Sequence, residues 1–288
     1  MADLQLALAA ARAHHILVVP EGLSYADIHA LAASYFPDVY PQDEYTFALA
    51  ADYSISGAYG LASEIRRELD IPAWAHSAFV AHVPPDRGAA LPSELAGIDP
   101  VWDAYPEGLP QGEEARALDF FRAAARRLGG ALVLAGGSIV VPDPDERPDL
   151  SVYSPIWLDP DTLDARLAPI LAGAHSSLQD ADSYELAEDV VLDAYSIYAP
   201  IAGGQISIEV QAEEFLPPSI AAFDWAAGGA VAYAVRFIAE NEDLRQLSLA
   251  QRRERSAAAR VIEAACRAIV ALAPGVVADD DGFLVDIQ

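Results

Sequence analysis

The order of predicted helices and strands is nearly the same in the two halves of this 288-residue chain. Each half begins with a short strand and a capped helix, at residues 15–20 and 24–36 in the first half and at 150–155 and 159–171 in the second. Two strands, a short helix and a further strand follow in each half, and a long helix and a β-hairpin end it. A repeated order of this length favours a fold built from two similar units.

The remaining predicted elements also form pairs. With the first half named before the second, these pairs are the strands 45–51 and 195–199, the strands 53–59 and 205–211, the helices 61–69 and 217–225, the strands 77–83 and 230–238, the helices 113–128 and 249–273, and the hairpins 131–141 and 276–285. The first six elements of each half have the order of a ferredoxin-like (βαββαβ) unit. We therefore predict an α+β protein formed by tandem duplication of such a unit, each copy followed by a long helix and a hairpin. The alternative is an Ala-rich α+β chain that can be divided in this way without any duplication.

Two segments interrupt the repeated pattern. Residues 142–149 are rich in Pro and carboxylates, which predicts a stiff, hydrated linker between a first domain at 1–143 and a second at 149–288. Residues 84–112 carry six Pro and show neither helical nor strand periodicity. A loop of this length is typical of a functional flap or lid.

The charge of the chain limits its partners. It has 44 acidic residues against 17 basic ones, all of them Arg, and a formal charge of −27 at pH 7. This balance argues against binding of nucleic acid or of an anionic membrane by the surface as a whole. It fits a surface that attracts a basic protein. Alternatively, the acidity is general to the proteome from which the chain comes, as in adaptation to salt.

The sequence predicts neither a membrane span nor a secretory signal. The longest apolar stretch, 220–239, is interrupted by Asp224, Arg236 and a Gly-Gly pair. Asp3 stands where a secretory signal would carry Lys or Arg. A single Cys excludes an intramolecular disulfide framework. We expect a cytoplasmic protein of unknown oligomeric state.

Sequence motifs of catalysis, metal binding and cofactor binding are missing. The six His show no His-x-x-x-His spacing, and there is no Walker loop, Gly-x-Gly-x-x-Gly or Gly-x-Ser-x-Gly motif. Cys266 lies on the apolar stripe of the last helix, where a Cys is usually an inert core residue. Residues 279–282 lack the Glu of a calcium loop and predict a hairpin turn. We expect no metal and no cofactor, and we nominate no catalytic residue.

Two groups of residues are candidates for partner binding. Trp102 and Tyr105, in the 84–112 loop, are the aromatic pair most open to a partner, although they could instead hold the loop in place. Nine of the 17 Arg lie on the two long helices, which gives each helix a basic face suited to carboxylate or phosphate recognition. The Arg candidates are Arg122, Arg126, Arg252, Arg253 and Arg255. The alternative is that these Arg neutralise nearby carboxylates and keep the helices soluble.

Two functions from different classes agree with these observations. The first is an inhibitor-like or immunity-like binding protein that presents an acidic surface to a basic protein partner, since opposite charges accelerate association. The second is an enzyme whose carboxylates and Arg form an active site in the cleft between the two repeats. The absence of a catalytic motif favours the first.

Overall fold

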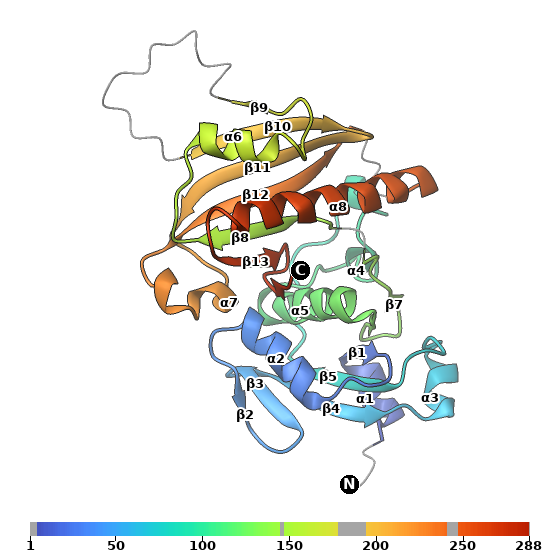
Figure 1. The fold of residues 1–288 in the computed structure, drawn as a ribbon. Helices are drawn as coiled ribbons and strands as arrows, with labels where there is room; N and C mark the ends of the chain where they lie inside the picture. Colours follow the sequence, from blue (N-terminus) through green and yellow to red (C-terminus); the bar gives the residue numbers. More distant parts are fainter. Residues whose placement is uncertain (1–4, 145–146, 178–193, 241–246, 288) are drawn as a thin grey trace. The chain divides into compact units, whose positions relative to one another are not determined.

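Figure 1 shows the computed structural model of the chain, which describes residues 5–144, 147–177, 194–240 and 247–287. The chain divides into two compact units, unit 1 (residues 1–144) and unit 2 (residues 145–288). Each unit contains one seven-stranded sheet together with helices, and neighbouring strands in both sheets are antiparallel. The predicted α+β class is therefore confirmed.

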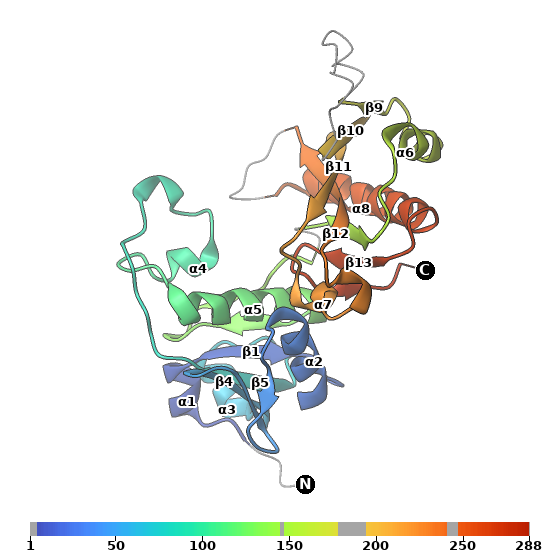
Figure 2. The same ribbon diagram turned by 90° about the vertical axis from the view of Figure 1, so that its left-hand side faces the viewer.

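In unit 1 the strands lie in the order β2-β3-β4-β5-β1-β6-β7. Its elements are α1 (Leu8–Ala13), β1 (His15–Val19), α2 (Tyr25–Tyr35), β2 (Tyr40–Pro41), β3 (Thr46–Ala50), β4 (Tyr53–Gly60), α3 (Ser63–Glu68), β5 (Ser77–His82), the 3-10 helix η1 (Ser93–Leu95), α4 (Pro100–Asp103), α5 (Gly112–Leu128), β6 (Ala131–Val133) and β7 (Ile139–Val140). Helices α2 and α5 cover one face of the sheet, and α1 and α3 cover the other (Figures 1 and 2). Because β1 lies between these two layers, all five of its residues are buried.

In unit 2 the strands lie in the order β14-β13-β8-β12-β11-β10-β9. Its elements are β8 (Leu150–Ser154), α6 (Pro160–Leu167), β9 (His175–Ser176), β10 (Ala194–Ile201), β11 (Gly204–Glu213), α7 (Pro218–Ala221), the 3-10 helix η2 (Asp224–Ala226), β12 (Ala230–Ala239), α8 (Leu249–Val270), β13 (Val276–Asp279) and β14 (Leu284–Val285). Helices α6 and α8 pack on the same face of this sheet and enclose the core of the unit (Figure 2). The short α7 and η2 form a smaller apolar cluster with Tyr153, Val276 and Ala278.

The two sheets have the same strand order. If β3, β4, β5, β1, β6 and β7 are matched in that order with β10, β11, β12, β8, β13 and β14, each strand has equivalent neighbours in the two units. The short edge strands β2 and β9 also match, each lying beyond the equivalent strand. The predicted repetition of elements is thus accompanied by a repetition of their arrangement in space.

This strand order differs from that of a ferredoxin-like unit, in which the fourth strand lies beside the first on the side away from the third. Here the fourth strand, β5 or β12, lies between the first and the third. The reason is that α3 has six residues and α7 has four, so neither is long enough to carry the chain across the sheet. The long helices α5 and α8 make the crossing instead, and the strands that each joins lie on either side of β1 or β8.

Equivalent glycines stand where the long helix of each unit returns to the sheet. A Cβ on Gly130 would lie 2.6 Å from the Val18 carbonyl oxygen, and a Cβ on Gly275 would lie 2.0 Å from that of Tyr153. Val18 pairs with Ala131, directly after Gly130, and Tyr153 pairs with Val276, directly after Gly275. The same close approach to the central strand therefore requires Gly in both units.

The C-terminal hairpins of the two units share a hydrogen-bonding pattern. Leu134 N–H donates to the Ser138 carbonyl in unit 1, and Asp279 N–H donates to the Phe283 carbonyl in unit 2. Gly137 and Gly282 hold the same place in the two turns, with φ of 101° and 82°. The segment 279–282 is thus a hairpin turn, as its Asp-Gly sequence predicts.

Other differences from the sequence prediction are local. Residues 53–59, the weakest predicted strand, belong to the full strand β4. Helix α1 and the short strands β2 and β9 were not predicted. Part of the linker 142–149 lies outside the described residues. Among the helices in the described ranges, none combines the length and the hydrophobicity needed to cross a bilayer.

Candidate functional site

Residues 84–111, between β5 and α5, form an ordered arm (Figure 2). Its two sides run antiparallel and are joined by backbone hydrogen bonds, from Gly88 N–H to the Leu109 carbonyl at 2.8 Å and from Leu109 N–H to the Ala89 carbonyl at 2.9 Å. Leu91 N–H also donates to the Pro106 carbonyl at 2.9 Å. The Pro-rich loop predicted as a flap is therefore a hairpin-like stalk.

The tip of the arm, residues 92–105, contains η1 and α4. Asp99 caps α4 by accepting from Val101 N–H at 2.8 Å. The same carboxylate accepts from both terminal nitrogens of Arg122 on α5, at 2.8 and 2.9 Å. A two-point Arg–carboxylate contact fixes orientation as well as distance, so the tip is held against the middle of α5.

The arm has almost no core of its own. Of its residues only Val101, at 3% exposure, is buried, and Leu91, Leu95, Ile98 and Trp102 are half-buried. Apolar burial therefore contributes little to its order. The polar contacts at its tip and at its base must supply the rest.

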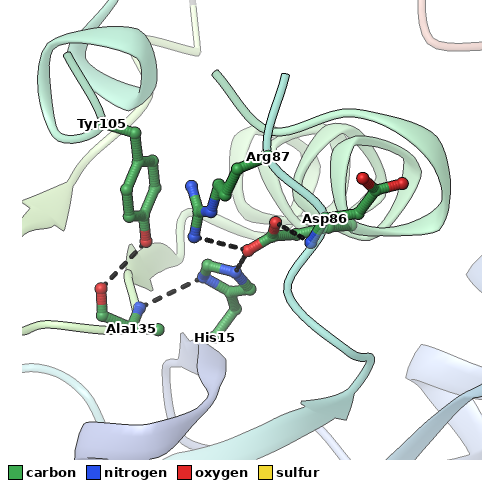
Figure 3. A network of polar contacts seen from close by, with 6 residues as sticks. His15, Asp86, Arg87, Tyr105 and Ala135 are labelled. Carbon is green, nitrogen blue, oxygen red and sulfur yellow. Dashed lines mark hydrogen bonds and ion pairs between the residues drawn. The ribbon is translucent and has the colours of Figure 1, made fainter. Parts of the chain in front are cut away.

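Glu114 holds the base of the arm (Figure 3). Its side chain is 1% exposed and accepts three hydrogen bonds: from Arg87 Nη2 at 2.6 Å, from Asp86 N–H at 2.8 Å and from His15 Nε2 at 2.9 Å. Two of these donors belong to the arm and the third belongs to the central strand of the sheet. The buried carboxylate thus ties the arm to the scaffold.

Tyr105 completes the attachment from the other side of the stalk. The guanidinium carbon of Arg87 lies 3.6 Å from the centre of the Tyr105 ring, which is a cation–π contact. The Tyr105 hydroxyl donates to the Ala135 carbonyl at 2.9 Å, and Ala135 N–H donates to His15 Nδ1 at 3.1 Å. Figure 3 shows these hydrogen bonds as a series that runs from Tyr105 through Ala135, His15 and Glu114 to Arg87, which lies beside the Tyr105 ring. We call His15, Arg87, Tyr105 and Glu114 the clamp.

The clamp depends on two polar residues placed where apolar ones are expected. His15 begins a strand whose other four residues are Ile, Leu, Val and Val. Glu114 is in the first turn of α5, in line with the buried Ala117, Leu118 and Phe121. The positive end of the helix dipole at this turn favours the carboxylate.

Unit 2 lacks the His of the clamp and has no carboxylate in the first turn of its long helix. Leu150 begins β8 where His15 begins β1. In the first turn of α8, Gln251 caps the helix together with Ser248, whereas the first turn of α5 carries Glu114. Unit 2 also has no long arm, because only residues 240–248 join β12 to α8. The clamp therefore occurs in the unit that has an arm to hold.

The structure brings three of the sequence candidates to the arm. Trp102 is half-buried in the tip, Tyr105 is engaged in the clamp, and Arg122 pairs with Asp99. The other Arg do not join this site: Arg126 is 9% exposed, Arg255 in unit 2 is 8% exposed, and Arg252 and Arg253 are exposed on α8. No motif in the sequence had indicated a role for His15, Arg87 or Glu114.

Among the described residues, a hydrogen-bonded Ser–His pair lies on the face of the unit 1 sheet that is opposite the clamp. Ser56 Oγ lies 2.6 Å from His82 Nε2, and the Tyr59 hydroxyl donates to Ser56 Oγ at 2.8 Å. Burial, with a smaller contribution from His14, lowers the pKa of His82. Ser56 is only 3% exposed and lies within β4. This burial withholds the hydroxyl from a substrate, so the pair stabilises the sheet.

Other chemistry is limited in the described part of the chain. It holds no group of three or more His, Cys, Asp or Glu side chains that could bind a metal. Burial raises the pKa of the Cys266 thiol to about 12, which makes it unreactive. A surface hollow of about 390 Å³ is lined by Arg12, Glu68, Leu69, Asp70, Gly136 and Gly137. Its Arg12–Glu68 pair is solvent-exposed, and its lining contains no nucleophile or His.

Among the carboxylates in the described part of the chain, Asp149 has the most displaced pKa. It accepts from Phe237 N–H at 2.9 Å near the start of β8, and burial raises its pKa to about 6. Asp280 raises this pKa further, whereas the Phe237 hydrogen bond, Arg236 and Arg255 oppose the rise. These partners all belong to unit 2, whereas the clamp belongs to unit 1.

Replacing Asp149 with Asn should stabilise unit 2 at pH 7.5. The folded pKa exceeds the unfolded one, so ionised Asp149 costs stability in full above pH 6, and the cost declines between about pH 6 and pH 4. Asn keeps the acceptor oxygen without the charge. After allowance for solvent screening we expect a gain of about 1 kcal/mol at pH 7.5 and only about a third of that at pH 4.5. Urea unfolding at both pH values measures it, with the exposed Asp38→Asn as control; a loss of stability at pH 7.5 would contradict the assignment.

Comparison of the chain with known family models, with curated proteins and with solved structures finds no match.

Proposed function

We propose that this protein binds a basic protein partner through the arm of unit 1, as an inhibitor or immunity protein does. The observation that carries the proposal is the contrast between the units: the same sheet occurs twice, and the copy with an arm also has a buried clamp that holds it. Loops positioned by a rigid scaffold commonly carry binding function. A segment that serves only as a connection needs no such attachment.

The chemistry of the arm indicates the kind of partner. Its residues include five carboxylates and one Arg, a formal charge of −4. Arg87 is committed to the clamp, while Glu94 and Glu107 are exposed. Trp102 stands among them as a half-buried aromatic residue. An aromatic anchor with an acidic rim fits a surface that offers an apolar pocket surrounded by Lys or Arg.

Affinity capture from native lysate, at low salt and at 0.5 M salt, tests this proposal. At 0.5 M the screening length falls to roughly 4 Å, so an electrostatically held partner should be recovered only at low salt. Trp102→Ala should weaken its binding by about thirtyfold or more, because a central aromatic contact commonly contributes 2 kcal/mol. The double variant Glu94→Gln, Glu107→Gln should weaken it by about tenfold at low salt.

A charge-matched control separates the arm from the general acidity of the surface. The control is the double variant Glu21→Gln, Asp38→Asn, which removes two exposed carboxylates elsewhere in unit 1. Its net charge is therefore the same as that of the arm double variant. We expect this control to bind as the parent protein does. If both double variants weakened binding equally, the overall charge of the surface and not the arm would be responsible. If no partner were recovered at either salt concentration, the proposal would be wrong.

We also propose that the two units arose by tandem duplication. The shared strand order, the equivalent Gly130 and Gly275 and the matching hairpin bonds support it. Few other residues are identical between the halves, which fits a duplication whose surface positions have diverged. The cytoplasmic location stays a prediction.

A further inference from the structure

We propose that His15 is a proton-sensitive latch that holds the arm when neutral and loosens it when protonated. This regulation rests on the proposed binding function of the arm. It concerns a residue that the partner itself need not touch, because His15 is only 3% exposed.

The contacts of His15 define its protonation state in the closed arm. Nδ1 receives the N–H of Ala135 at 3.1 Å, so this nitrogen carries a lone pair and no proton. Nε2 lies 2.9 Å from the Glu114 carboxylate, which can only accept, so this nitrogen carries the proton. A neutral imidazole thus satisfies both contacts, and an imidazolium can satisfy only the second.

Protonation of Nδ1 would set two donors against each other. The new N–H would face the N–H of Ala135, and this residue must then move away from the ring. The Ala135 carbonyl is the acceptor of the Tyr105 hydroxyl, so movement of Ala135 also weakens the contact that fixes Tyr105. Tyr105 in turn supports Arg87. A single proton on His15 therefore acts on the arm through Ala135, which lies in the turn between β6 and β7.

The charged groups around His15 have opposing effects. Glu114, from α5, favours the imidazolium, whereas Arg87, from the arm, disfavours it. His14 and His82 lie together on the opposite face of the sheet, with ring centres 5.1 Å apart. The Ala135 N–H distinguishes neutral from protonated His15, because it can donate a hydrogen bond to Nδ1 only when Nδ1 carries no proton.

Hydrogen exchange of the full-length protein at pH 7.5 and pH 5.5 tests the latch. The reporters are the arm amides that are hydrogen-bonded in the closed state, those of Gly88, Leu91 and Leu109. After correction for intrinsic exchange, their protection should fall by about tenfold or more at pH 5.5, as one linked proton allows. His15→Gln keeps the Nε2 donor and cannot be protonated, so its protection should be the same at both pH values.

Two controls make the result specific. His14→Gln alters the neighbouring His on the other face and should retain the pH response, and the amides of α8 in unit 2 should show no loss of protection at pH 5.5. If His15→Gln fails to fold, an NMR titration of the parent protein replaces it, and the Ala135 amide resonance should then move together with the His15 ring. Unchanged arm protection in the parent protein, or a response that survives His15→Gln, would overturn the latch. Because no partner is present, this outcome is independent of whether the binding proposal holds.

Discussion

Replacing Glu114 with Ala should lower the free energy of unfolding of unit 1 by about 3 to 5 kcal/mol, the usual cost of breaking a buried ion pair from one side. The substitution leaves Arg87, His15 and the Asp86 N–H without their shared acceptor. The guanidinium of Arg87 would then remain against Tyr105 with no counter-charge from the clamp. Urea unfolding at pH 7.5 measures the loss, and exchange of the arm amides shows whether the arm detaches.

Glu113→Ala is the matched control for this substitution. Glu113 precedes Glu114 in the same turn of α5, so both variants remove a carboxylate from the same end of the helix dipole. Its ion pair with Arg116 is partly exposed to solvent, with side-chain exposures of 37% and 49%, against 1% for Glu114. We expect a loss of only about 0.5 kcal/mol. Equal losses in the two variants would show that the clamp contributes nothing beyond the helix end.

Gly275→Ala should destabilise unit 2 by about 3 kcal/mol, toward the upper end for inserting a methyl group into a packed site. The new Cβ would lie 2.0 Å from the Tyr153 carbonyl oxygen, which belongs to the central strand and cannot rotate away as a side chain could. Gly130→Ala should have a similar but smaller effect on unit 1, since its Cβ would lie 2.6 Å from the Val18 carbonyl oxygen. Thermal or urea unfolding measures both.

Gly228→Ala is the control for the loss of a glycine. Nothing lies within 4 Å of a Cβ at this position, and its φ is not in the left-handed region. Ala reduces the freedom of the unfolded chain, so we expect no loss and a gain of up to about 1 kcal/mol. If Gly275→Ala proved as harmless as Gly228→Ala, the close approach of β13 to β8 would not be a constraint on the sequence.

The sequence was sufficient to predict most of the longer elements and the repetition of their order, because these depend on local patterns. The capped helix after β1 and the Asp-Gly hairpin at 281–282 are read from neighbouring residues alone. Strand order was not predictable in the same way. The ferredoxin-like expectation assumed that the helices at 61–69 and 217–225 cross the sheet, and the structure shows that both are too short.

The clamp was missed because its members are far apart in the chain. His15 and Glu114 are separated by 99 positions, and only the packing of α5 on β1 brings them together. A signal was nevertheless present: Glu114 is a carboxylate in line with the apolar stripe of its helix, and such a residue needs a buried partner. The meeting of His14 and His82 depends on strand register in the same way, because His15 pairs with Ala81.

The segment that precedes the long helix is much longer in unit 1 than in unit 2, and this difference has a consequence for how the chain can vary. Residues 240–248 join β12 to α8 in unit 2, so the shared sheet is built there with a short connection. The arm of unit 1 is accordingly a module that can be exchanged while the scaffold is retained. Residues at its tip can vary with little cost to the core, since Val101 alone among the arm residues is buried. Under the binding function that we propose, a change of this module would change the target while the framework stays the same, much as antibodies change their loops on a constant framework.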